Sequence, residues 1–409
     1  MVEKVMSIKN ISDIVLSKGY SPTVFITGVT GQDGSLMIDY LLKNTNSWII
    51  GGARRLSVEN HANIKHLENE PRFQLVNFDL TDSHSIYKLM ETAKPDYFIN
   101  FAAQSFVASS WDFARQTWQV NSTGVLDCLE AIRKVKPDCR FYNAGSSEEF
   151  GNVTYSPQDE NHPLRPRSPY GASKAAARQL IKVYRESYSL YAVQGWLFNH
   201  EGVRRGEEFV TRKITKGVVR VVKELKNCNV ALNTFKPIEL GNVDAKRDWS
   251  DAEDMVDAVW RMLNQDTYNL EIASLVLPLV SRSSLPESYY TSGGYSEMMK
   301  KLVIPKLKDY VVSSDENHTI RELVGLAFKA AGVEDGYWSG VELVERFVID
   351  RPPFQLALVT INPRFYRPAE IEVLCGNSSA VRKDLGWEPK TSFEQLVKKM
   401  VNNDLNLSN

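Results

Sequence analysis

A tyrosine and a lysine in the segment Ser168-Pro169-Tyr170-Gly171-Ala172-Ser173-Lys174 have the clearest chemical potential in this chain. Tyr-x-x-x-Lys spacing on a helix places both side chains on one face, one turn apart. A nearby ammonium favours an ionised phenol, so Lys174 can lower the pKa of Tyr170 from its usual value of about 10. This would give an oxidoreductase a base near neutral pH. On spacing alone, a surface contact on an ordinary helix is the commoner alternative.

Ser146 and Glu148 lie upstream of this pair, directly after a predicted strand. The serine adds a proton donor and the glutamate adds a second base, which favours a dehydration over a simple dehydrogenation. Ser146 could instead cap a turn, and Glu148 could pair with an arginine. Because ligands bind at the carboxyl ends of strands in open α/β sheets, the position of both residues favours a catalytic role.

Alternating strands and helices must position these groups. The rhythm begins near residue 23 and predicts an α/β fold with a Rossmann-type, doubly wound parallel sheet. After about residue 198 it loosens, which predicts a smaller, mostly C-terminal α/β substrate lobe. Short apolar runs predict strands at 24–26, 48–50, 73–76, 97–101 and 140–144, and a helical pattern covers 125–135.

The same pattern suggests a division into domains. The expected parts are an N-terminal extension at 1–22, an NADP-binding domain at 23–198 that segments near 236–265 rejoin, and a substrate domain at 199–409 with an insertion at 267–308.

Gly28, Gly31 and Gly34 follow the first predicted strand and open the first predicted helix. Glycines here let the backbone approach a pyrophosphate, which then lies on the helix N-terminus. The spacing is Gly-x-x-Gly-x-x-Gly, and an ordinary strand-to-helix turn is the alternative. The strand–turn–helix context favours a dinucleotide site.

Arg54 and Arg55 follow the second predicted strand. An acidic residue there would bind the ribose of NAD, whereas arginines suit the 2′-phosphate of NADP; a solvated basic turn is the alternative. The ends of the next two predicted strands supply candidate contacts to the adenine and ribose: Asp79, Leu80, Ala102 and Ala103.

Composition limits the classes of function. The 409 residues carry a formal net charge of -1, which gives no electrostatic footprint for nucleic acid or an anionic membrane. The 4 cysteines and 6 histidines show no ligand-type spacing, so we expect no metal site and a reducing compartment. No signal-peptide pattern or membrane-spanning apolar run is visible, and we therefore expect a cytoplasmic protein.

With these motifs, the chain resembles the extended short-chain dehydrogenase/reductase family, within it the nucleotide-sugar dehydratases, and most closely the GDP-mannose 4,6-dehydratase branch. The resemblance spans most of residues 23–405. It departs from the branch at Ser146, where threonine is usual, at Phe150, where tyrosine is usual, and in the N-terminal extension and insertion. Segments that carry it include 26–35, 141–148, 167–170, 184–188, 197–201, 204–207, 209–214, 247–249, 363–370 and 385–387.

The resemblance implies an NADP-dependent internal redox dehydration of GDP-mannose to GDP-4-keto-6-deoxymannose. Tyr170, assisted by Lys174, would take the proton of the sugar's 4-hydroxyl. Glu148 would remove the proton at carbon 5, and water would leave carbon 6 with help from Glu148 or Ser146. Further cofactor contacts are expected at Gln32, Asp33 and His200, beside the glycines, Tyr170 and Lys174.

A second set of residues matches family positions that hold the pyrophosphate and guanosine. Arginine suits a diphosphate because its planar fork donates two parallel hydrogen bonds. Acidic residues lie close by in the sequence, so a salt-bridged surface is the alternative. The set is Asn199, Val210, Lys213, Arg247 and Glu370, with Arg364 as a further candidate.

Two other classes of function stay open. One is a dehydratase or epimerase for another nucleotide sugar, for example a GDP-heptose; an epimerase would not need Glu148. The other is a non-catalytic NADP-binding regulator, which typically lacks the tyrosine or the lysine. The resemblance also implies a homodimer or homotetramer, with the loop at Arg54 and Arg55 near a neighbouring subunit.

Overall fold

The computed structural model describes residues 21–56, 60–226, 236–265, 307–366 and 373–407. Residues 1–20 of the expected N-terminal extension, the expected insertion up to residue 306, and the substrate candidate Glu370 lie outside this part of the chain.

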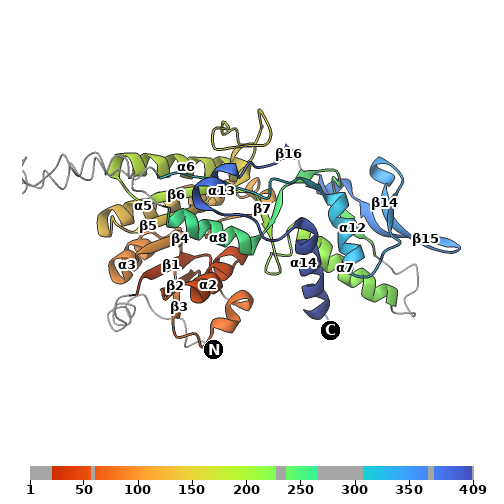
Figure 1. Cartoon of the computed structure of the whole chain (residues 1–409), viewed down its shortest axis with the longest axis horizontal. Helices are drawn as coiled ribbons and strands as arrows, with labels where there is room; N and C mark the ends of the chain where they lie inside the picture. Colours follow the sequence, from red (N-terminus) through yellow and green to blue (C-terminus); the bar gives the residue numbers. More distant parts are fainter. Residues whose placement is uncertain (1–20, 57–59, 227–235, 266–306, 367–372, 408–409) are drawn as a thin grey trace, which may run out of the picture.

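A parallel sheet forms the centre of the larger lobe (Figure 1). Its strand order reverses between β1 and β4, and the crevice at such a reversal binds ligands in folds of this kind. The predicted α/β fold of Rossmann type is confirmed, and the five predicted strands are β1 to β5. In spatial order the strands are β11 (Val311–Val312), β6 (Ala192–Leu197), β5 (Arg140–Ala144), β4 (Tyr97–Asn100), β1 (Thr23–Thr27), β2 (Trp48–Ala53) and β3 (Phe73–Asn77).

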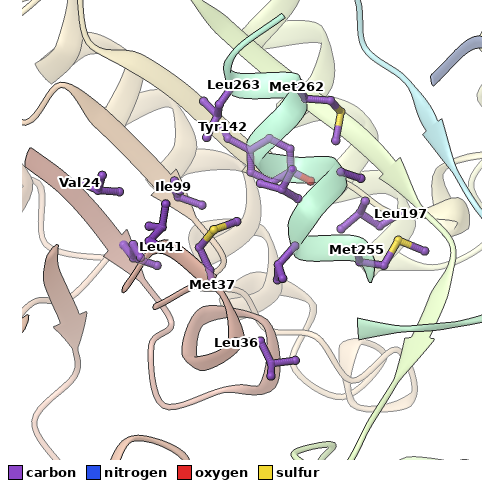
Figure 2. Close-up of a cluster of buried hydrophobic side chains, with 14 of the residues drawn as sticks. Val24, Leu36, Met37, Leu41, Ile99, Tyr142, Leu197, Met255, Met262 and Leu263 are labelled. Atoms are coloured by element: carbon purple, nitrogen blue, oxygen red, sulfur yellow. The ribbon is translucent and has the colours of Figure 1, made fainter. Parts of the chain in front are cut away.

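Helices cover both faces of this sheet. On one face, α2 (Gln32–Asn44) and α8 (Ala252–Leu263) bury their apolar sides against the strands. Figure 2 shows this cluster, with Tyr142 of β5 among Met37, Met262 and Leu197. The other face is covered by α3 (Ser83–Ala93), α5 (Gly124–Val135), which confirms the helix predicted at 125–135, and α6 (Pro169–Tyr188).

Between β4 and α5 the chain forms short helical turns. The described residues here include η4 (Ala108–Ser110), α4 (Ala114–Trp118) and η5 (Gln119–Thr123), a single π-helical turn. Such turns are common at functional sites. Within η5, the Asn121 amide accepts from Gln104 N at 2.9 Å and donates to the Ser173 hydroxyl of α6 at 3.2 Å. The loop after β4 is thereby tied to the helix that carries Tyr170.

The smaller lobe lies at the right of Figure 1, where α7 (Val210–Lys226), α12 (Ile320–Ala330) and α14 (Phe393–Leu407) pack around one apolar cluster. Its sheet has the order β13 (Tyr337–Ser339), β14 (Arg346–Arg351), β15 (Phe354–Ile361) and β8 (Ile238–Leu240). Short strands and turns complete it: β7 (Asn199–Glu201) with β10 (Trp249–Asp251); β12 (His318–Thr319), β9 (Lys246–Arg247) and β16 (Val373–Leu374); and the turns η7 (Glu342–Val344) and η8 (Pro363–Phe365). Helix α13 (Ser379–Leu385) instead packs on the larger lobe, where Val381 joins the apolar cluster of α2 and α8.

The chain crosses between the lobes more than once. Within the segment 236–265, α8 packs on α2 in the larger lobe, whereas β8 pairs with β15 in the smaller sheet. Strand β11 then returns to pair with β6 of the large sheet. The domain boundaries stated above stay a prediction.

A run of buried polar side chains crosses four strands at the level where β1 and β4 end. Thr27 Oγ1 donates to Asn100 Oδ1 at 2.5 Å, and Asn100 Nδ2 donates to Asn143 Oδ1 at 2.7 Å. Asn143 Nδ2 then donates to Gln194 Oε1 at 2.7 Å. Because a buried amide is costly without partners, this polar run fixes β1, β4, β5 and β6 relative to one another.

We expect Asn143→Ala to lower the free energy of unfolding by about 2–4 kcal/mol, because it leaves the Asn100 amide and the Gln194 carbonyl unpaired inside the protein. Urea unfolding measures the change. The control is Asn44→Ala, which removes an exposed bond to Tyr40 O and should alter stability by less than about 0.5 kcal/mol. Equal effects of the two substitutions would contradict a structural role for the polar run.

Candidate active site

The start of α6 places Tyr170. Ser168 caps the helix by accepting from Gly171 N at 3.0 Å, and Pro169 occupies its first turn. Gly171 lets this turn approach the segment after β5, because a Cβ at position 171 would lie 2.5 Å from the carbonyl oxygen of Glu148. Tyr170 is thereby buried beside the Ser146–Glu148 turn, with 8% of its surface exposed.

The turn η6 (Ser147–Glu149) contains the predicted glutamate, Glu148, and the predicted serine, Ser146, caps its start. Ser146 Oγ accepts from Glu148 N at 3.2 Å, and Ser146 N donates to Glu149 Oε1 at 2.9 Å, which together form a capping box. Both predicted residues act on Tyr170: burial is the main influence and raises its pKa, a hydrogen bond with Ser146 opposes this rise, and the charge of Glu148 adds to it. The structure therefore brings Ser146, Glu148 and Tyr170 together.

Lys174 is buried beneath Tyr170, with its ammonium 5.8 Å from the centre of the Tyr170 ring. Its Nζ donates to the Ala144 carbonyl at 2.7 Å. Burial lowers the pKa of Lys174 to about 8, against the opposing charges of Glu149 and Asp33. The structure thus places the predicted pair on one buried helix face and not on the surface.

The predicted direction of the Tyr170 pKa is wrong for this structure. Burial raises the pKa above its ordinary value, and the charges of Glu148 and Glu149 add to this rise. The physical reason is that the Lys174 ammonium bonds a backbone carbonyl instead of the phenol oxygen.

Arg205 is a neighbour of this site that sequence reasoning did not select. Its guanidinium lies 3.5 Å from the centre of the Phe209 ring, and its Nε lies 3.0 Å from the Glu201 carboxylate. Its charge lowers the pKa of Tyr170 and also acts on His200. The segment 204–207 contributed to the family resemblance, but only the fold shows that this arginine lies near enough for its charge to act on Tyr170.

The glycine-rich turn between β1 and α2 has the close packing that a nucleotide site needs. Gly28 has a φ of +70°, and a Cβ there would lie 2.8 Å from Ala102 N. A Cβ at Gly34 would lie 2.4 Å from the Gly28 carbonyl oxygen. No side chain caps α2 at Gly31, so the first-turn N–H groups suit a pyrophosphate. These features fit a dinucleotide.

Asp33 and His200 pair across this turn, with His200 Nε2 2.9 Å from Asp33 Oδ2. The other ring nitrogen of His200 donates to Phe198 O at 2.8 Å, and Gln32 Nε2 donates to His200 O at 3.1 Å. Burial opposes the Asp33 charge, but His200 lowers the pKa of Asp33 to about 2. The three predicted cofactor residues thus join α2 to β7; contact with a cofactor stays a prediction for them.

The remaining cofactor candidates surround the same edge of the sheet. Arg54 and Arg55 are exposed directly after β2, and Ala102 and Ala103 are half-buried after β4. Asp79 Oδ1 accepts from Thr81 N at 2.9 Å and so orders the turn before α3.

Leu80 lies in the apolar core, where a Cβ on Gly124 would come within 2.7 Å of its Cγ. Its side chain therefore packs in the core, and contact with a cofactor stays a prediction for Asp79 and Leu80.

Some substrate candidates converge and others lie apart in separate elements. Lys213 of α7 has its Nζ 3.6 Å from the centre of the Phe365 ring, next to the exposed Arg364. Val210 begins the same helix. Asn199 of β7 pairs with Trp249 of β10, and Arg247 is buried in β9 with its Nη1 2.7 Å from Lys246 O.

The fold and the site together define a Rossmann-type protein with a glycine-rich turn suited to a dinucleotide, where the half-buried Ser146 and Glu148 adjoin the buried Tyr170 and Lys174. The family described as GDP-mannose 4,6 dehydratase matches residues 25–275 and 288–400. The chain belongs to this family.

Curated relatives cover nearly the whole chain. The GDP-mannose 4,6 dehydratase of Drosophila melanogaster is 36% identical over 390 residues, covering 93% of this chain and 86% of the relative. GDP-mannose 4,6 dehydratase 2 of Caenorhabditis elegans is 36% identical over 417 residues, covering 99% of this chain and 95% of the relative.

Solved structures share the fold. RMD from Pseudomonas aeruginosa complexed with NADPH has a TM-score of 0.66 at 20% identity, covering 95% of this chain and 100% of its own. UDP-glucose 4-epimerase from Thermotoga maritima, with UDP-glucose, has a TM-score of 0.69 at 18% identity and the same coverage of 95% and 100%. At these identities the likeness concerns the fold alone.

We expect Asp33→Asn to destabilise the protein by about 2 kcal/mol at pH 5 and by about half as much at pH 3. The folded-state pKa of Asp33 is about 2 against an ordinary 3.8, so its contribution is complete above pH 3.8 and is lost as the pH falls toward 2. The raised pKa of His200 has the opposite sign: its contribution is complete below its ordinary value of 6.5 and is lost as the pH rises through the raised value.

Urea unfolding at several pH values measures this dependence. Glu91→Gln, an exposed change on α3, is the control and should alter stability by less than about 0.5 kcal/mol. A difference between wild type and Asp33→Asn that is the same at pH 5 and pH 3 would contradict the prediction.

Proposed function

We propose that this protein is an NADP-dependent GDP-mannose 4,6-dehydratase, which converts GDP-mannose to GDP-4-keto-6-deoxymannose with loss of water. The curated relatives that cover the chain bear this name. The observation that carries the proposal is the packing of the Ser146–Glu148 turn against the start of α6, where Tyr170 lies. A carboxylate beside the phenol supplies the second base that elimination of water requires.

In the proposed reaction, NADP would accept the hydride of carbon 4 and return it to carbon 6. The Tyr170 oxygen takes the proton of the 4-hydroxyl, and the hydrogen bond from Ser146 and the charge of Arg205 favour the phenolate. The new ketone acidifies carbon 5, whose proton passes to Glu148. The carbon 6 hydroxyl leaves as water after it gains a proton from Glu148 or with help from Ser146. When the hydride returns to carbon 6, carbon 5 takes up a proton equivalent to the one that the 4-hydroxyl gave up, so the overall change is the loss of one water.

The roles of the binding residues are part of the same proposal. The glycine-rich turn would hold the pyrophosphate of NADP, and Arg54 and Arg55 would meet its 2′-phosphate. Lys213 and Arg364, which lie on neighbouring elements, would hold the GDP group together with Asn199 and Arg247.

Location and assembly complete the proposal. In the part of the chain that the structure describes, no helix is both long enough and apolar enough to cross a membrane. We propose that the protein acts in the cytoplasm as a homodimer or homotetramer. Trp111, Phe113 and Trp118, exposed at 50%, 57% and 47%, support a self-association surface. Light scattering of the purified protein tests the assembly, and a monomer would contradict it.

We expect Glu148→Gln to abolish formation of the 4-keto product from GDP-mannose while NADP still binds. The amide keeps the size of the side chain but cannot take the carbon 5 proton, and loss of one general base costs about 10²–10⁴ in rate. Product is measured by mass spectrometry after incubation with GDP-mannose and NADP, and NADP binding by calorimetry.

The matched control is Glu186→Gln, an exposed glutamate further along α6, which should leave turnover unchanged. Wild-type protein that makes no product from GDP-mannose would contradict the proposed function. Retained turnover in Glu148→Gln would contradict only the role of Glu148. A parallel screen of other GDP- and UDP-sugars would show whether another sugar is the substrate.

A further inference from the structure

A buried ion pair, Glu149 with Arg178, adjoins the Ser146–Glu148 turn. Arg178 Nε lies 2.5 Å from Glu149 Oε2, and Nη2 donates to Glu149 Oε1 at 3.2 Å. Only 4% of Arg178 and 0% of Glu149 are exposed. A pair removed from water in this way contributes little to stability unless all its hydrogen bonds are made, so its retention calls for a reason.

Further contacts surround the Glu149–Arg178 pair. Arg178 Nη1 donates to Gln194 O at 2.6 Å, and its guanidinium lies 3.4 Å from the centre of the Trp196 ring. Asp309 Oδ2 lies 3.5 Å from the same nitrogen. Glycine is required at position 145, because a Cβ there would lie 2.8 Å from both Glu149 Oε1 and Arg178 Nη2. These contacts fix the position of the Glu149 carboxylate.

The carboxylate of Glu149 binds the backbone of the Ser146–Glu148 turn. Its Oε1 accepts from the Ser146 backbone N–H at 2.9 Å and from Gln194 Nε2 at 3.0 Å. Ser146 Oγ in turn accepts from the backbone N–H of Glu148. The backbone of Ser146 and Glu148 therefore depends on a side chain that is fully buried and bonded to Arg178 and Gln194.

We propose that Glu149 and Arg178 are positioning residues, a buried ion pair that holds the Ser146–Glu148 turn at the correct place against Tyr170. This inference rests on the proposed function for its effect on turnover. Its structural part, that the pair orders the turn, can be measured without substrate.

The pair also has an electrostatic effect on the site. Burial lowers the pKa of Lys174, and the negative charges of Glu149 and Asp33 oppose this fall. Tyr170 lies on the same helix face, with its ring centre 5.8 Å from the ammonium. Removal of the Glu149 charge would therefore cause Lys174 to lose its proton at lower pH, an effect that a purely structural role would not produce.

Three variants test the proposal. Glu149→Leu/Arg178→Met removes the acceptor of the Ser146 N–H without leaving a charge unpaired. Glu149→Gln keeps an acceptor oxygen but removes the charge, and Asp309 stays close to Arg178. The matched control is Asp404→Asn on α14, because Asp404 is also buried and lies 2.5 Å from a buried arginine, Arg212.

Hydrogen exchange of the peptide covering 145–150 measures how well the turn is ordered. NADP affinity, kcat, KM and the pH profile measure the effect of each variant on cofactor binding and catalysis. We expect the double variant to exchange about tenfold faster in this peptide. Its kcat should fall about 10²-fold, as for a misplacement of about 1 Å, while NADP affinity and KM change less than about threefold.

Glu149→Gln should restore most of the exchange protection and kcat, and the alkaline limb of its kcat/KM profile should move to lower pH. Asp404→Asn should lower the melting temperature about as much as Glu149→Gln, with wild-type exchange in 145–150 and a wild-type pH profile.

Wild-type exchange at 145–150 in Glu149→Leu/Arg178→Met would overturn the proposal, and so would faster exchange accompanied by undiminished kcat. A wild-type protein inactive on GDP-mannose would instead refute the proposed function. In that case the exchange comparison alone decides whether the pair orders the turn.

Discussion

The polar run from Thr27 to Gln194 and onward to Glu149 and Arg178 is the interaction on which the rest of the structure depends. Each member is buried, so none can exchange its partner for water without a free-energy cost. The run begins beside the glycine-rich turn and ends next to the Ser146–Glu148 turn. The two parts of the site, which come from distant segments of the sequence, are thereby held at one fixed separation.

Burial also determines the charge state of the site. It raises the pKa of Tyr170 and lowers the pKa of Lys174, so the surroundings oppose both the phenolate and the ammonium. Glu149 and Asp33 oppose the loss of the Lys174 proton, and Arg205 favours the phenolate. The charge states of Tyr170 and Lys174 therefore depend on the surrounding charges as well as on the two residues themselves.

Much of the fold could be predicted from sequence, because the first five strands are short apolar runs and Ser168-Pro169 marks the start of α6. The meeting of Ser146, Glu148 and Tyr170 followed from strand ends and spacing. Strand β6 was missed because Gln194 and Gly195 interrupt its apolar pattern, and β11 because two residues carry no period. The partner of Lys174 and the place of Arg205 depend on contacts between distant segments, which no local pattern encodes.

Strand β11 has a consequence for how the protein can be divided. It pairs with β6 at the edge of the large sheet, although more than a hundred residues separate the two strands in the chain. A fragment that stopped before residue 307 would keep the glycine-rich turn and the Ser146–Glu148 turn. It would also expose the backbone of β6 to solvent and to other chains. Such a truncated product would be prone to aggregate, so the larger lobe is not an autonomous folding unit of contiguous sequence.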